Sequence, residues 1–319
     1  MVVDAIGRGN GPTNWSWLWS QQNEHRIVVP RLLIWVDLFA FGGKNISLLA
    51  EIIIIQLAQV FAVSFVLERF TSVPAFLKRS LQGLFAFALF HPNQLENFTW
   101  SFQIGFVLPF ALGTFALLCI AFLPRSSQLS LGIALLGVIP LLAAMNLAAG
   151  LLIGPATIVI ACLRRLRLSL LMTLTAASVV SWCVYLHGYR RDGADLSLTD
   201  DLGHGKNLIV YVLTYFGASW TGLLPHKERL IATISIIVFL ALAAKAMRRS
   251  REISNFEWFL IGECILALAT ALLTATGRLQ FGVGQAFASR YQTPAMIYWA
   301  AFGGLILLWF TDTGRLTLL

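Results

Sequence analysis

We predict an all-α, polytopic integral membrane protein, a helical bundle of about nine transmembrane helices with further helices at the interface. Three observations predict the membrane class: 58% of the 319 residues are apolar, only 12% are charged, and the mean hydropathy is +0.77. A soluble domain carries about 25% charged residues. A soluble chain of this composition would expose more apolar surface than monomers tolerate, so the sequence argues against a water-soluble enzyme or binding module.

Apolar segments that could span a membrane run through most of the chain. They cover residues 46–67, 80–91, 103–123, 128–147, 150–163, 168–187, 229–247, 257–277 and 295–311. A spanning helix needs about 20 apolar residues, so segments 80–91 and 150–163 are short. Gly150, Gly154 and Pro155 interrupt the second of these. Such interruptions are tolerated where other helices or a cavity satisfy the freed backbone groups. We therefore expect a protein-lined interior near them.

The basic residues predict the orientation. If alternate loops from 68–79 onward are cytoplasmic, these short loops hold 12 of the 23 Lys and Arg residues. The remaining 11 are spread over much longer outer loops, so the positive-inside rule supports this orientation. We expect a multi-pass protein of the bacterial inner (plasma) membrane with a cytoplasmic C-terminus. The net charge of +8 then reflects topology, and we expect no nucleic-acid partner.

The chain is predicted to form a single transmembrane domain over residues 1–319. Residues 1–45 form an extracytoplasmic loop that contains an interfacial helix at 27–41, and residues 188–228 form a large extracytoplasmic loop with a second interfacial segment at 207–224. Because an outer N-terminus without a preceding helix is unusual, we expect that one transmembrane helix before this sequence is missing. All five histidines fall on or beside the outer face, so chemistry is expected there.

Three polar clusters on the outer side are candidates for function. The first joins Glu24, His25 and Arg26, the second runs from His91 to Gln103 and includes Glu96, and the third contains the SRYQTP string with Arg290 and Tyr291. A carboxylate can take a proton from a hydroxyl nucleophile, and an arginine can hold a phosphate through two hydrogen bonds. The alternatives are a solvated loop, a helix-capping loop and an arginine that extends to the headgroups.

Other polar residues are less informative. Gln56, Gln59 and Glu263 lie within apolar segments, where polar groups are costly unless they face the interior. We place Glu263 near a helix end, where a wet interfacial position is as reasonable as a functional one. The four cysteines have no metal-binding spacing, and no phosphate-binding loop or zinc motif is present. We predict no metal site and no cofactor, and the sequence does not specify whether a divalent cation is needed.

Three strings together resemble a group of uncharacterised polytopic bacterial membrane proteins. They are WSQQNEHRIVVPRLL at 19–33, HPNQLENFTWSFQIGF at 91–106 and GRLQFGVGQAFASRYQTP at 277–294. That group is similar in layout to the GT-C glycosyltransferases, which use polyprenyl-phosphate sugars. Its members usually begin with one more helix and an acidic motif beside a Trp. In this sequence, Asp4 is the only acidic residue near the position of that motif.

The resemblance implies an inverting transfer of a sugar from a polyprenyl-phosphate donor to a cell-envelope acceptor on the extracytoplasmic side. The catalytic residues it implies are Glu24, as a base or base-orienting group, and His25. The substrate-binding residues it implies are Arg26, Glu96, Gln103, Arg290 and Tyr291, with Arg26 and Arg290 on the phosphate. Expected partners are membrane lipids and the lipid-linked sugar. The other interpretations are a transporter or flippase of lipid-linked or small solutes, and a non-catalytic membrane component.

Overall fold

The computed structural model describes residues 15–23, 25–124, 131–190, 205–248 and 253–312. Within these ranges the chain is helical, apart from an isolated bridge between Gln22 and His25. Six of the described helices are long and apolar enough to cross a membrane, which confirms the predicted class of helical, multi-pass membrane protein. They are α4 (Ile46–Phe70), α7 (Ile104–Phe122), α10 (Leu168–Leu186), α13 (Glu228–Arg248), α14 (Asn255–Arg278) and α15 (Gln292–Asp312).

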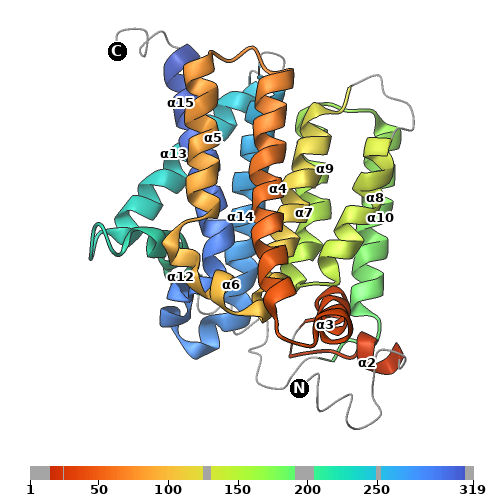
Figure 1. Cartoon of the computed structure of the whole chain (residues 1–319). Helices are drawn as coiled ribbons and strands as arrows, with labels where there is room; N and C mark the ends of the chain where they lie inside the picture. The colour runs from red at the N-terminus through yellow and green to blue at the C-terminus, as the bar shows by residue number, and fades with distance from the viewer. Residues whose placement is uncertain (1–14, 24, 125–130, 191–204, 249–252, 313–319) are drawn as a thin grey trace.

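Three shorter helices lie beside these six. They are α5 (Ala75–Leu89), α8 (Leu131–Ala144) and α9 (Ile153–Leu163). Helix α5 packs between α4 and α15, while α8 and α9 pack between α7 and α10 (Figure 1). Each is shorter than the roughly 20 residues of an ordinary span. The 3-10 helix η3 (Ala148–Leu152) precedes α9 and contains Gly150, whereas Gly154 and Pro155 lie in the first turn of α9 and do not break it.

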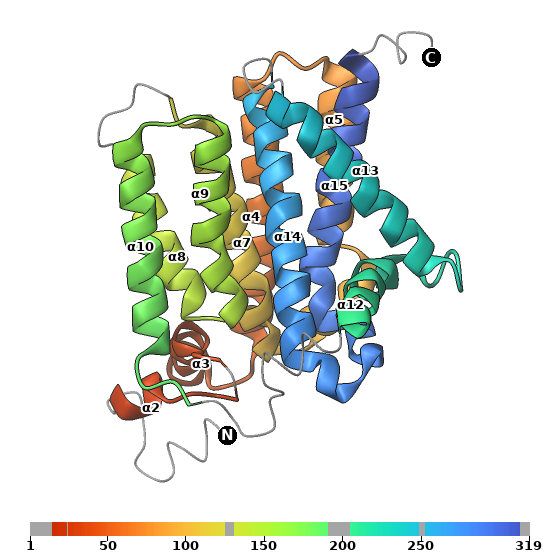
Figure 2. The same ribbon diagram turned by 180° about the vertical axis from the view of Figure 1, so that it is seen from behind.

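The bundle has a buried centre and a lipid-facing periphery. Helices α7, α14 and α15 are mostly buried, whereas α4, α10 and α13 are mostly exposed. Helix α13 leans away from the bundle and crosses in front of α15 in the view of Figure 2. The exposed side chains on the outer helices are large and apolar, for example Phe61 on α4 and Ile237 on α13. Side chains of this kind are stable on an outer surface when lipid, not water, surrounds them.

The short helices gather at one end of the bundle. There α2 (Trp15–Trp19), α3 (Val28–Phe41), α6 (Leu95–Thr99) and α12 (Gly205–Gly217) lie near one another in the lower part of Figure 1. The α4–α5 and α9–α10 connections and the C-terminal end of α15 lie at the opposite end. Of the loops predicted to be cytoplasmic, the described segments 71–74 and 164–167 thus share one end. The end that carries the short helices is called the α3 end below.

Helix α3 matches the predicted interfacial segment 27–41 and runs across the bundle, so that it is seen end-on in Figure 1. Its two charged residues are buried. Arg31 donates hydrogen bonds to the backbone oxygens of Trp17, Leu18 and Ser20. Asp37 accepts from the Asn45 amide at 3.0 Å and from the Ser47 hydroxyl. These charges therefore fasten α3 to the segments before and after it.

Arg164 lies in one of the basic loops that were used to predict the orientation, and it also holds the fold together. At the end opposite α3 its buried guanidinium donates to the backbone oxygens of Ile120 and Leu123 and to the Asn255 side chain. The last carbonyls of a helix have no partners within the helix. Arg164 donates hydrogen bonds to such carbonyls at the C-terminal end of α7. It thereby links α7 and α9 to the start of α14.

Candidate functional site

A cavity of about 440 Å³ opens at the α3 end of the bundle. One part of its wall is apolar, with Phe106, Phe110 and Leu147 from α7 and the α8–η3 connection and Leu273 from α14. The other part is polar and aromatic, lined by His25, Tyr185, Tyr189, Tyr215, Arg278, Arg290 and Tyr291. The cavity therefore offers an amphipathic ligand two cations and several tyrosines beside a hydrocarbon-like surface.

His25 is the predicted catalytic residue that the structure places in this cavity. A tight turn positions it: the Gln22 amide donates to the His25 oxygen at 2.8 Å, and the His25 amide donates to the Gln22 oxygen at 3.0 Å. Asn23 adopts a left-handed conformation with φ of 49° within the turn, a conformation that Asn tolerates well. The turn points the imidazole toward η3, where the Ala148 amide lies 3.5 Å from Nδ1. Glu24, the other predicted catalytic residue, lies outside the described residues.

The imidazole of His25 is neutral at physiological pH. Burial and, to a smaller degree, the positive charge of Arg278 lower its pKa from 6.5 to about 4. A neutral imidazole accepts a hydrogen bond at one ring nitrogen and donates one from the other. Because Nδ1 accepts from the Ala148 amide, Nε2 carries the proton, and His25 can donate a hydrogen bond to a ligand in the cavity.

Arg290 belongs to the short turn η7 (Ser289–Tyr291), directly before α15. Its Nη1 atom lies 3.4 Å from the Glu96 Oε1 atom, and its backbone amide donates to Glu96 Oε2 at 3.2 Å. Gln103 donates to Glu96 Oε1 at 3.3 Å. The guanidinium also stacks over the Tyr291 ring at 5.3 Å. Two predicted clusters thus meet: Arg290 and Tyr291 line the cavity, while Glu96 and Gln103 stand behind Arg290 and orient it.

Arg278 is a cavity residue that the sequence reasoning did not assign to the site. It ends α14, where the helix dipole favours a positive charge. Its guanidinium lies 5.8 Å from the centre of the Phe281 ring. The signal in the sequence was present, because Arg278 begins the same GRLQFGVGQ string that leads to Arg290.

Tyrosines surround the two cavity arginines. The Tyr215 and Tyr291 rings lie 6.1 Å apart, and Tyr185 and Tyr189 form a second stacked pair at 6.0 Å. Burial raises the pKa of Tyr215 well above its ordinary value. Its hydroxyl therefore keeps its proton at physiological pH. Tyrosine hydroxyls and ring faces of this kind suit a polyhydroxylated ligand, because each ring supplies an apolar face and each hydroxyl both donates and accepts.

Arg26 lies beside this cavity but does not line it. Its guanidinium donates to the backbone oxygens of Tyr185, at 2.9 Å, and of Trp19 and His187, and it stacks over the Trp19 ring at 5.0 Å. These carbonyls take three of its five N–H donors, so Arg26 joins the N-terminal segment to the end of α10, and it lines a separate cavity with Gln21 and Arg190. The cavity of His25 instead pairs Arg290 with Arg278.

The fold and the cavity define a class: a multi-pass helical membrane protein with an amphipathic, arginine- and tyrosine-lined cavity at one end of its bundle. No protein-family model, curated protein or solved structure matches this chain. Its function must therefore be argued from the site.

Proposed function

We propose that this protein is a GT-C-like glycosyltransferase that moves a sugar from a polyprenyl-phosphate donor to a cell-envelope acceptor. In this proposal α5, α8 and α9 also cross the membrane, which gives nine spans. The α3 end of the bundle faces the extracytoplasmic side of a bacterial plasma membrane, and the C-terminus is cytoplasmic. The donor occupies the cavity of His25, Arg278 and Arg290, with its phosphate at headgroup depth.

The observation that carries the proposal is the composition of this one cavity. A polyprenyl-phosphate sugar has an anionic phosphate, a hydroxyl-rich sugar and a long hydrocarbon chain. Arg278 and Arg290 supply cations that suit the phosphate. The tyrosines suit the sugar, and Phe106, Phe110 and Leu273 supply an apolar wall for the first isoprene units. A small soluble substrate would make no use of that wall.

The chemistry requires one bond to form as another breaks. An acceptor oxygen attacks the anomeric carbon, the bond from that carbon to the phosphate oxygen breaks, and the phosphate leaves with the bonding electron pair. The transition state carries positive charge at the sugar and growing negative charge on the phosphate. Arg278 and Arg290 stabilise the leaving phosphate, and Glu24, the predicted base, accepts the acceptor hydroxyl's proton. His25 lies in the same cavity as the two arginines and donates a hydrogen bond that orients the acceptor or the sugar.

The transporter interpretation is the second candidate, because the structure has a polar feature that it would need. Gln56, Gln59 and Glu263 are buried within the bundle, away from the cavity. Transporters commonly bind their substrates near the middle of the membrane. Uptake or flipping of a lipid-linked sugar in vesicles, without release of polyprenyl phosphate, would favour this candidate.

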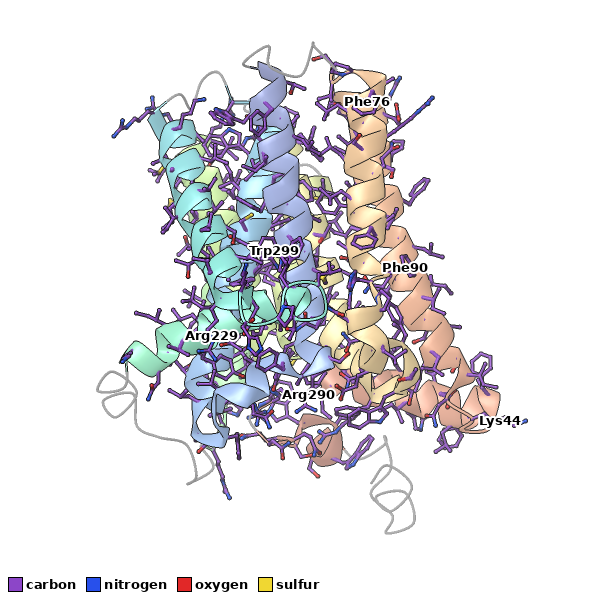
Figure 3. The ribbon with its side chains drawn as sticks, turned by 90° about the vertical axis from the view of Figure 1, so that its left-hand side faces the viewer. Lys44, Phe76, Phe90, Arg229, Arg290 and Trp299 are labelled. Carbon is purple, nitrogen blue, oxygen red and sulfur yellow. The ribbon has the colours of Figure 1, made fainter. Side chains whose placement is uncertain are left out.

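The test is transfer from a radiolabelled polyprenyl-phosphate sugar by the purified protein in lipid nanodiscs, scored as release of polyprenyl phosphate. We expect Arg278→Gln and Arg290→Gln each to reduce release at least tenfold, because a charged hydrogen bond contributes about 1.5–3 kcal/mol. Arg229→Gln is the matched control: Arg229 is an exposed arginine on α13, away from Arg290 in Figure 3. Equal activity of all three variants and the wild type would refute the site.

A further inference from the structure

A second cavity, of about 590 Å³, lies where α2 meets the segment that follows α10 (Figure 2). Among the described residues, none lines both this cavity and the cavity of His25. The wall of the second cavity is polar: it has two arginines, two serines, two side-chain amides, a histidine and one large ring, that of Trp19. These described lining residues include no aliphatic side chain, so the cavity suits a water-soluble ligand.

Two short segments form the partition between the two cavities. In the N-terminal segment, His25 lines the first cavity and its neighbour Arg26 lines the second. In the segment after α10, Tyr189 lines the first cavity and its neighbour Arg190 lines the second. Gln21 fastens the segments together, because its Nε2 donates to the Arg190 oxygen at 2.6 Å and its Oε1 accepts from the Arg190 amide at 3.0 Å. Adjacent residues thus serve different cavities.

Arg26 is held firmly in this partition but keeps donors for a ligand. Its side chain is only 3% exposed. Three of its N–H groups donate to backbone oxygens, and its guanidinium stacks over the Trp19 ring at 5.0 Å. A guanidinium has five N–H groups, so two have no partner among the described residues. Because the group is already fixed, a ligand does not have to immobilise it on binding.

The positive charge at this cavity has no carboxylate partner among the described residues. The ion pairs in that part of the chain involve neither Arg26 nor the buried Arg31. Arg31 stands behind the cavity wall and donates to the backbone oxygen of Ser20, a lining residue. Burial and then the charge of Arg26 lower the pKa of Arg31 to about 10, so Arg31 stays charged at neutral pH. Buried charges are ordinarily paired, and an anionic ligand would pair these.

We propose that the second cavity binds a water-soluble sugar that carries an oxyanion, either a phosphate or a carboxylate. Arg26 and Arg190 bind the oxyanion through charge-assisted hydrogen bonds, for which both groups are suitable acceptors. Asn23 and the two serines offer partners for the sugar hydroxyls. The proposal assigns Arg26 to a soluble anion and not to the lipid phosphate. It goes beyond the glycosyltransferase proposal and does not depend on it.

Saturation-transfer NMR of the protein in nanodiscs of zwitterionic lipid tests this proposal with three probes: glucose 6-phosphate, glucuronic acid and glucose. We expect at least one anionic probe to bind about tenfold more tightly than glucose, because its oxyanion gains charged hydrogen bonds. The anion that binds better identifies the oxyanion that the cavity prefers. Added salt should weaken this binding, because ions screen charges that solvent reaches. Equal binding of all three probes, or no binding of either anion, would overturn the proposal.

Three variants locate the bound anion. Arg190→Gln should weaken its binding several-fold and still fold, because the Arg190 side chain is exposed and only its backbone bonds to Gln21. Arg229→Gln, which removes an exposed arginine on α13, is the matched control and should bind as the wild type does. Arg278→Gln, which alters the first cavity, should also bind normally. Normal binding by Arg190→Gln, or loss of binding in Arg278→Gln, would refute the second cavity as the site.

A protection experiment gives a readout that does not need a weakened variant. In a protein without the native cysteines, Ser20→Cys places a thiol in the wall of the second cavity. The better-binding anion should slow its labelling by a neutral maleimide, whereas glucose should not. Lys44→Cys lies at the same end but outside the described lining of the cavity, so its labelling rate should not change. Unslowed labelling of Ser20→Cys at a saturating anion concentration would contradict the proposal.

Discussion

The guanidinium of Arg290 lies 3.4 Å from the carboxylate of Glu96, although 194 residues separate the two in sequence. The contact joins the loop before α7 to the loop before α15 and orients a cation at the wall of the cavity. Both side chains are about 30% exposed. Such a pair contributes little to folding stability, because solvent screens it. Its effect should therefore be on ligand binding.

Glu96→Gln should weaken binding of a lipid phosphate more than it weakens the fold. The variant loses the charge that holds Arg290, so we expect the affinity for polyprenyl phosphate to fall several-fold while the unfolding free energy changes by about 1 kcal/mol or less. Binding to nanodiscs and thermal unfolding measure the two quantities. Glu68→Gln, which breaks the Glu68–Lys78 pair at the opposite end, is the control and should not change affinity.

His25 should make the protein less stable as the pH falls. Its pKa is 6.5 when exposed and about 4 when folded, so between these values the unfolded chain binds a proton that the folded chain does not. Stability should therefore rise with pH from about 4 to 6.5 and level off above that range, by at most about 3 kcal/mol. Melting temperatures across this pH range should show the slope in the wild type. His25→Gln should flatten it, and the exposed His187→Gln should not.

Gly150 should be intolerant of any side chain. A Cβ atom there would lie 2.2 Å from the backbone of Ala143, where neither side can give way. We expect Gly150→Ala to destabilise the protein by about 1–3 kcal/mol or more. Gly137→Ala on α8 is the matched control, because nothing lies within 4 Å of its added Cβ. That substitution should stabilise the helix slightly. Thermal unfolding measures the stability of both variants. Equal melting temperatures would contradict the close packing of Gly150 against Ala143.

The orientation can be read by labelling single cysteines. In a variant without the native cysteines, Lys44→Cys should react with a membrane-impermeant maleimide added outside intact cells, and Ser72→Cys should react only after the membrane is opened. Lys44 lies at the α3 end and Phe76, near Ser72, at the opposite end (Figure 3). The reverse pattern would place the cavity in the cytoplasm and would end the glycosyltransferase proposal in its present form.

The sequence by itself determined that the chain is a helical membrane protein. Runs such as 46–67 and 257–277 have no other stable environment than lipid or a protein core, and hydropathy is a local property that needs no knowledge of the fold. It also predicted a separate segment at 27–41, where Arg31 and Asp37 interrupt an otherwise apolar run, and α3 (Val28–Phe41) is a helix there. Length and composition identify six spanning helices. Helices α5, α8 and α9 are shorter than an ordinary span, so the count of nine spans stays a prediction.

Only the tertiary structure decided which polar residues face a shared cavity. Arg26 and Arg278 are both arginines in conspicuous strings, yet the first is held by three backbone carbonyls and the second lines the cavity. Likewise, Gln56, Gln59 and Thr114 form one hydrogen-bonded chain only because α4 and α7 pack together. A side chain's hydrogen-bond partners come from segments remote in sequence. Its role is therefore fixed by packing, which no local pattern encodes.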